Sequence, residues 1–168
     1  MRISLQTRYN DYDPRGHVNN AVYFSFFEVG RMHAWVAVGG GADADFILAD
    51  AHIAYRSPAM LGDPLALEVT TTEVRTKAWV WGYRVVDARD DRLVAEGTTT
   101  QVMYDYATRR TIPVPDALRQ ALTALRRPRE RDRTPRAGTR SSSRRSRSSS
   151  ASALPPAIRR GVRATAPR

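Results

Sequence analysis

The segment "DYDPRGHVNN", residues 11–20, gathers polar side chains immediately before a strongly apolar run. Its titratable and amide groups belong to Asp11, Asp13, His17, Asn19 and Asn20. A carboxylate or an imidazole in such a segment can act as a nucleophile or as a general base. Pro14 restricts the backbone and Gly16 permits a tight turn, so the segment has the composition of a well-defined loop. It is therefore the first candidate for a chemical site.

The apolar run after this loop predicts a long buried helix. From Ala21 to about Val38 the apolar residues have helical spacing, and aromatic residues occupy more than one face. Glycines at 39–41 are expected to end the helix. Asn19 or Asn20 is the expected N-cap, because a side-chain amide oxygen can accept a hydrogen bond from the first turn.

The N-terminus of this helix could itself take part in a reaction. Its first NH groups have no partner within the helix and carry a partial charge of about +0.5, so they can stabilise an oxyanion. A carboxylate beside them, as Asp13 would be, can attack an ester or thioester or activate water to do so. The same residues could instead be a turn aspartate, cap residues and, for His17, a hydrogen-bonded loop residue. Local chemistry leaves the hydrolytic and the structural interpretations both open.

The rest of the domain predicts a single antiparallel sheet. Residues 2–9 alternate like a half-buried strand, and strand-like segments follow at 47–57, 65–76, 78–88 and 92–106. Short polar turns between them imply antiparallel pairing, and a final amphipathic helix starts after Pro115. The expected fold is α+β, with a curved antiparallel sheet of about five strands wrapped around one long buried helix. Pairing of the sheet edges with a second copy would give a dimer.

Charge and composition divide the chain in two. Residues 1–125 carry a net charge of −2 and residues 126–168 a net charge of +12. The first part is expected to form one domain, because 42% of the 168 residues are apolar, enough to fill a core. The second part has almost no large apolar residues and is expected to be a disordered Arg/Ser-rich tail.

Several kinds of site and location are excluded. The chain has no cysteine, which rules out disulfides and thiolate chemistry. His17, His33 and His52 lack the spacing of a metal site, so no metal or cofactor is expected. The N-terminal residues lack the apolar region of a secretory signal, and no apolar window has the length of a membrane span. The expected location is the cytoplasm, without membrane contact.

Two motifs resemble the hotdog-fold acyl-CoA thioesterases. "RYNDYDPRGHVNNAVYFSFFEVGR" (8–31) and "YRSPAMLGDPLALEV" (55–69) are similar to the 4-hydroxybenzoyl-CoA thioesterase branch, and "HVNN" also resembles plant acyl-ACP thioesterases. The likeness covers roughly residues 2–125. It implies a hotdog fold and the hydrolysis of an acyl thioester to the free acid and CoA.

The resemblance also implies roles for individual residues. In that branch the second Asp of D-x-D-P-x-G is the catalytic carboxylate, which falls here on Asp13 as nucleophile or general base. The residue seven positions later, here Asn20, gives the backbone NH that polarises the thioester carbonyl. His17 or Asn19 would orient water or the carboxylate. Arg15 stands where the acyl-ACP enzymes have an Asn, so their catalytic network is not expected to be complete.

The family usually builds this site between two subunits, with the pantetheine arm along their interface. A homodimer or homotetramer acting on acyl-CoA, or on acyl-ACP, is therefore implied. The residues that could contact the substrate lie at the helix start and in the second motif: Tyr23, Phe24, Phe27, Arg56 and Ser57. The alternatives are core packing for the aromatic residues and an ordinary exposed strand end for the other two.

Two further functions stay open beside an acyl-CoA thioesterase. One is an acyl-ACP thioesterase, and the other is a non-catalytic hotdog module that binds acyl-CoA. The positive charges of the tail could contact nucleic-acid phosphates. However, the tail has no aromatic residue for base stacking and no fold to read base edges, which favours a solubilising extension.

Overall fold

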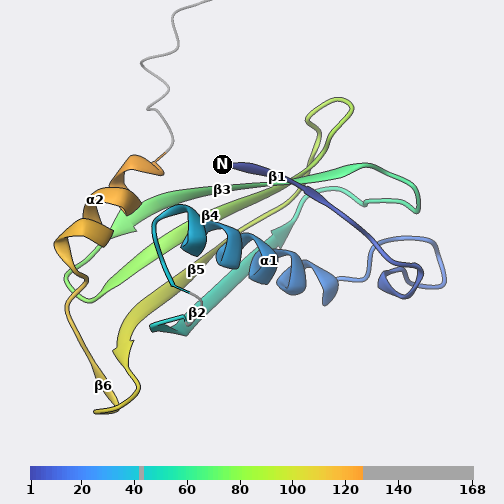
Figure 1. Cartoon of the computed structure of the whole chain (residues 1–168). Helices are drawn as coiled ribbons and strands as arrows, with labels where there is room; N and C mark the ends of the chain where they lie inside the picture. Colours follow the sequence, from blue (N-terminus) through green and yellow to red (C-terminus); the bar gives the residue numbers. More distant parts are fainter. Residues whose placement is uncertain (42–43, 127–168) are drawn as a thin grey trace, which may run out of the picture. The chain divides into compact units, whose positions relative to one another are not determined.

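The computed structural model describes residues 1–41 and 44–126, and Figure 1 shows one long helix lying across a curved sheet. The predicted tail lies outside the described residues except for Arg126. In chain order the elements are β1 (Arg2–Leu5), a 3-10 helix (Tyr9–Asp11), α1 (Val22–Ala37), β2 (Phe46–Tyr55), β3 (Leu65–Val74), β4 (Ala78–Asp87), β5 (Leu93–Asp105), β6 (Arg110–Thr111) and α2 (Asp116–Ala124). The predicted α+β class and the curved antiparallel sheet around one long helix are confirmed.

The strand order is β1-β3-β4-β5-β2, with β6 paired to the end of β5, and every pairing is antiparallel. The inference that consecutive long strands are neighbours is wrong for β2 and β3, which lie near opposite edges of the sheet. Residues 56–64 connect these two strands. Three strand spacings amount to about 14 Å. A segment of this length reaches about 30 Å, so the connection can pass along the end of the sheet.

The core lies between α1 and the inner face of the sheet. Phe27 stacks on Tyr83 with ring centroids 4.4 Å apart, and Trp35 stacks on Trp79 at 6.0 Å. Gly30 lets the helix approach closely, because a Cβ there would press on Leu67 and on neighbouring side chains of the sheet. Helix α2 contributes the fully buried Leu122 at the end of this core.

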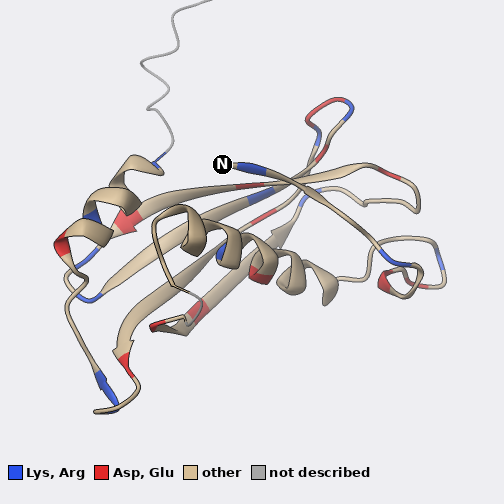
Figure 2. Ribbon diagram, viewed as in Figure 1, with Lys and Arg blue, Asp and Glu red and all other residues tan. Residues whose placement is uncertain are grey.

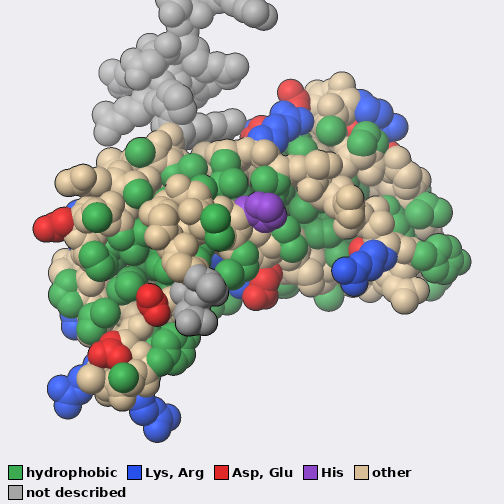
Figure 3. All heavy atoms as spheres, in the orientation of Figure 1, with side chains coloured by type: hydrophobic (Ala, Val, Ile, Leu, Met, Phe, Trp, Pro, Cys, Tyr) green, Lys and Arg blue, Asp and Glu red, His purple; other side chains and the backbone are tan. Residues whose placement is uncertain are grey.

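The burial of α1 is one-sided in the single chain. Its inner face is buried through Tyr23, Phe26, Phe27, Gly30, Arg31, Ala34 and Trp35. Its outer face leaves large apolar side chains exposed, namely Phe24, Val29, Met32 and Val36. Figure 3 looks onto this face and shows hydrophobic side chains spread across it. The apolar pattern on several sides of the helix therefore has two causes: contact with the sheet, and an exposed apolar surface.

The first strand is shorter than its alternation predicts. It ends at Leu5, and the chain then turns through the 3-10 helix Tyr9–Asp11. The NH of Arg8 donates to the carboxylate of Asp11 at 2.7 Å, which fixes this turn. Tyr9 is 85% exposed, so this turn lies on the surface of the domain, directly before the Asp13 loop. In the part of the chain that the structure describes, no helix is long and apolar enough to cross a membrane.

Candidate active site

The loop around Asp13 is a tight turn built on the carboxylate itself. Oδ1 of Asp13 accepts hydrogen bonds from the NH of Arg15 at 2.9 Å and of His17 at 3.0 Å. The Asp13 carbonyl accepts from the NH of Gly16 at 2.9 Å, and Gly16 takes the positive φ of 79° that this turn requires. Because Oδ1 accepts two hydrogen bonds from backbone NH groups, the orientation of the Asp13 side chain is fixed.

These hydrogen bonds also set the charge of Asp13. The hydrogen bond from the NH of His17 has the largest effect on the pKa of Asp13 and, with that from Arg15, holds it below the ordinary value of 3.8, although burial opposes this lowering. The group is therefore ionised at neutral pH. Oδ2 accepts no hydrogen bond from any described residue and lies 3.9 Å from Nδ1 of His17, too far for a hydrogen bond. Oδ2 is thus the carboxylate oxygen of Asp13 that has no hydrogen-bond partner among the described residues.

The helix start differs from the prediction in its cap. The N-cap is Ala21 rather than Asn19 or Asn20, because the chain makes one more turn before α1 begins. Asn19 stabilises that turn: its Oδ1 accepts from the NH of Ala21 and its carbonyl from the NH of Val22, both at 3.0 Å. Asn20 lies in the turn, and its carbonyl accepts the hydroxyl of Tyr55 at 2.8 Å. Within the described chain the NH of Asn20 donates to no protein group, so it is available to a ligand.

A cavity of about 460 Å³ gathers these groups at one end of the sheet. It is lined by Asp13, His17, Val18, Asn19, Asn20, Tyr23, Tyr55, Arg56, Ser57 and Pro58. The structure therefore brings together both sequence motifs and all four residues predicted to do chemistry. Of the predicted contact residues, Tyr23, Arg56 and Ser57 reach the cavity. Phe27 does not: it is fully buried in the core, and Phe24 points outward, 44% exposed.

Tyr55 is the main residue that sequence reasoning missed. It is the first residue of the second motif, but only the position of β2 at the sheet edge shows that it ends beside the helix start. Its ring meets that of Tyr23 edge to face, with centroids 5.3 Å apart. Burial, and then the neighbouring Tyr55, raise the pKa of Tyr23 to about 12, so its hydroxyl stays neutral.

Arg56 and Ser57 are already engaged by protein groups. Nε and Nη2 of Arg56 donate to the carboxylate of Glu96 at 2.9 and 2.7 Å. Ser57 donates its hydroxyl to the carbonyl of Leu93 and accepts from Arg92, both at 2.7 Å. A substrate group that used Arg56 would compete with this ion pair.

Another hollow and two titratable side chains of α1 lie apart from this cavity. A larger hollow of about 660 Å³ lies on the outer face of the sheet, among threonines, and shares only Arg56 with the first cavity. Glu28, 3.3 Å from Arg31 on α1, and His33 are outside both cavities. Across residues 1–41 and 44–126 no three His, Asp or Glu side chains come together as a metal site.

Known proteins match both the sequence and the fold. Residues 7–122 match the model of the thioesterase-like superfamily. The long-chain acyl-CoA thioesterase FadM of Escherichia coli K12 is 25% identical over 133 residues, covering 74% of this chain and 98% of that protein. A thioesterase of Thermus thermophilus, solved with coenzyme A and Zn, superposes with a TM-score of 0.67 and 29% identity over 76% of this chain and 95% of that one. The 1,4-dihydroxy-2-naphthoyl-CoA thioesterase Slr0204 of Synechocystis shares the fold, with a TM-score of 0.66 and 22% identity over 76% and 98% of the two chains.

Proposed function

Because the chain belongs to the thioesterase-like superfamily of hotdog proteins, we propose that it hydrolyses an acyl-CoA thioester to the free acid and CoA. The observation that carries this proposal is the meeting of two groups in one cavity. Asp13 supplies an ionised carboxylate with Oδ2 free, and Asn20 supplies an NH without a protein partner at the start of α1. A thioester carbonyl between these two groups would meet a base or nucleophile on one side and an oxyanion donor on the other.

Both forms of the reaction are compatible with this arrangement. As a general base, Asp13 takes a proton from water while the water oxygen adds to the thioester carbon, after which the C–S bond breaks and the CoA thiolate leaves, taking the proton back from Asp13. As a nucleophile, Oδ2 itself adds, the CoA thiolate leaves, and water then opens the mixed anhydride. In either case the carbonyl oxygen gains charge, which the NH of Asn20 and the dipole of α1 stabilise. His17 and Asn19, which line the same cavity, would orient the water.

A second copy of the chain is part of the proposed site. Two surfaces of the single chain are uncovered. The outer edge of β2 pairs with none of the described strands, and one face of α1 exposes large apolar side chains. Exposed strand edges and apolar patches are surfaces that proteins cover by association. A homodimer or homotetramer would cover both surfaces and extend the cavity for the acyl chain. Sedimentation of the full chain tests this, and a monomer at assay concentrations would refute it.

The test of the function is thiol release by the full-length protein from acyl-CoAs that differ in chain length and aromatic content. Turnover of at least one of them supports the proposal. A folded protein that turns over none of them but hydrolyses acyl-ACP would be the carrier-protein enzyme. One that binds acyl-CoA without turnover of either would be the non-catalytic module.

Replacing Tyr55 by Phe is expected to lower kcat/KM by about tenfold. The ring would keep its place against Tyr23, but the hydrogen bond to the Asn20 carbonyl would be lost, and the oxyanion donor would be less well oriented. Steady-state thiol release measures this effect. Tyr106→Phe is the matched control, because that hydroxyl also donates to a backbone carbonyl, that of Phe46. Equal losses in both variants would argue against a role for Tyr55 in orienting Asn20.

The pH dependence of the rate is expected to lack an acid limb near neutrality. The pKa of Asp13 is lowered, so its ionised form, the active one, persists down to a pH below the ordinary value of 3.8. Activity is lost only as the pH falls through that lowered pKa and the carboxylate gains a proton. The measurement is kcat/KM from about pH 3 to about pH 8, with tryptophan fluorescence confirming the folded state. A midpoint near pH 6 would instead indicate a histidine.

A further inference from the structure

The second motif holds the Asp13 loop through backbone contacts. The NH of Val18 donates to the carbonyl of Ala59 at 2.9 Å, and the NH of Leu61 donates to the carbonyl of Gly16 at 3.0 Å. Between these two hydrogen bonds, His17 and Met60 form an isolated antiparallel bridge. The position of the Asp13 loop therefore depends on where residues 57–61 lie.

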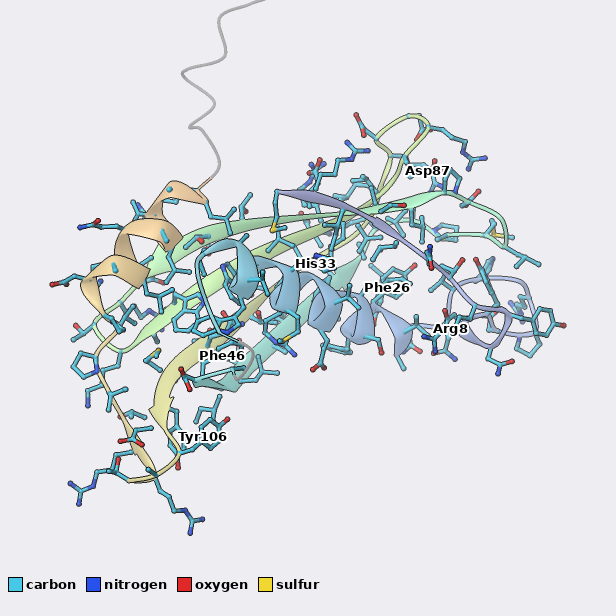
Figure 4. All side chains as sticks on the ribbon, viewed as in Figure 1. Arg8, Phe26, His33, Phe46, Asp87 and Tyr106 are labelled. Carbon is cyan, nitrogen blue, oxygen red and sulfur yellow. The ribbon has the colours of Figure 1, made fainter. Side chains whose placement is uncertain are left out.

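A network of opposite charges lies behind residues 57–61, at the turn between β4 and β5. Asp87, only 1% exposed, ends β4, and Figure 4 labels it beside this turn. Arg89 bridges the carboxylates of Asp87 and Asp63, and Arg92 approaches the same two carboxylates at 3.2 and 3.6 Å. Figure 2 shows both signs of charge at this turn. The contacts with Arg89 in particular hold the pKa of Asp87 well below its usual range, so Asp87 is ionised at neutral pH.

Arg92 connects this network to the cavity wall. Its Nη1 donates to the hydroxyl of Ser57 at 2.7 Å and to the carbonyl of Pro58 at 2.9 Å, while its Nη2 donates to Asp87 at 3.2 Å. Ser57 and Pro58 both line the cavity. One planar guanidinium thus fixes two cavity residues relative to a buried carboxylate at the end of a core strand.

Such a network contributes more to geometry than to stability. The carboxylates of this network are largely buried but the Arg89 and Arg92 side chains are partly exposed, and ion pairs of this kind add little net stability, because desolvation and solvent screening offset their attraction. An arginine fork, in contrast, has five donors in a fixed plane and restricts its partners in direction as well as distance. The effect of Arg92 is therefore expected in the placement of residues 57–61.

We propose that Arg92, held by Asp87, is a positioning residue: it fixes residues 57–61 and, through them, the loop that presents Asp13. Its kinetic consequence rests on the proposed thioesterase function. Its structural consequence is the protection of the backbone hydrogen bonds between the Asp13 loop and residues 57–61, and this consequence is independent of the proposed function.

The kinetic test compares the full-length protein with Arg92→Gln and Arg92→Lys. We expect kcat to fall about tenfold in Arg92→Gln with KM changed less than about twofold, because a small displacement of Asp13 affects the transition state more than binding. We expect a similar fall in kcat for Arg92→Lys, because an ammonium group cannot contact Ser57, Pro58 and Asp87 in one plane as a guanidinium does. Arg75→Gln is the matched control: it removes an ion pair with Glu73 at the β3–β4 turn.

Hydrogen exchange supplies the readout that does not need activity. We expect the amides of Val18 and Leu61 to exchange about tenfold faster in Arg92→Gln than in the wild type, with the exchange of Trp81 in the core unchanged. Unchanged exchange at Val18 and Leu61 would overturn the proposal, as would faster exchange that extends equally to Trp81. If the wild type hydrolyses no thioester, the proposed function fails while this measurement still decides the role of Arg92.

Discussion

Replacing Asp13 by Asn is expected to lower kcat/KM for acyl-CoA hydrolysis by about 10²- to 10³-fold, the cost of removing the proposed base or nucleophile. The substitution is close to isosteric, and the amide oxygen can still accept from the NH groups of Arg15 and His17. The loop should therefore keep its shape while losing the charge on Oδ2. Thiol release under kcat/KM conditions measures the loss, with circular dichroism to confirm the fold.

Asp105→Asn is the matched control for this experiment. Oδ1 of Asp105 accepts from the NH groups of Ala107 and Thr108 at 2.8 and 3.1 Å, so it stabilises a turn as Asp13 does. It lies at the end of β5 and does not line the cavity. Its replacement should leave the rate unchanged. If Asp13→Asn kept more than about a third of the activity, the assignment of Asp13 as the reacting group would be wrong.

Replacing Gly97 by Ala is expected to reduce the free energy of unfolding by about 2–3 kcal/mol, through overpacking. Gly97 lies on β5 between β4 and β2. A Cβ there would press on the backbone carbonyl of His52 and lie 2.6 Å from Cε2 of Phe27. Neither can give way easily, because His52 belongs to the strand ladder and Phe27 is stacked on Tyr83. Urea unfolding, followed by tryptophan fluorescence, measures the change.

Gly41→Ala provides the comparison. A Cβ at Gly41 meets no atom within 4 Å, so this substitution should alter the free energy of unfolding by less than about 0.5 kcal/mol. A Gly97 variant as stable as the Gly41 variant would show that β2 or α1 can shift without cost. The packing of Phe27 against the sheet would then be looser than the structure indicates.

The elements of the fold could be predicted because their signals are local. The apolar spacing of residues 21–38 and the alternation in the four long strands each depend on near neighbours, and the structure places elements at these positions. The neighbour of β2 could not be predicted in this way. Pairing with β5 rather than β3 depends on the path of residues 56–64 along the end of the sheet, which no local pattern records.

The residues of the candidate site likewise fall into those that local sequence predicts and those that only the fold brings together. Asp13, His17, Asn19 and Asn20 are adjacent in sequence, so their types alone predicted a shared location. Tyr55 and Pro58 reach the same cavity only because β2 ends there. Phe27 shows the limit of helical spacing: it lies on the same side of α1 as Tyr23 but four residues, about 6 Å, further along the helix, where it stacks on Tyr83 and does not line the cavity.

The crossing of β2 to the far edge of the sheet also bears on how the protein folds. The hydrogen bond from Tyr55 to Asn20 joins residues 35 apart, and the bonds from residues 57–61 to the Asp13 loop span similar separations. Contacts that close such long loops carry an entropic penalty and form slowly. The 55–61 segment leaves β2, which pairs with β5, and leads toward β3 near the opposite edge of the sheet. The Asp13 loop therefore rests on a segment that the completed sheet positions, and a nascent chain that ends before β5 lacks the strand with which β2 pairs.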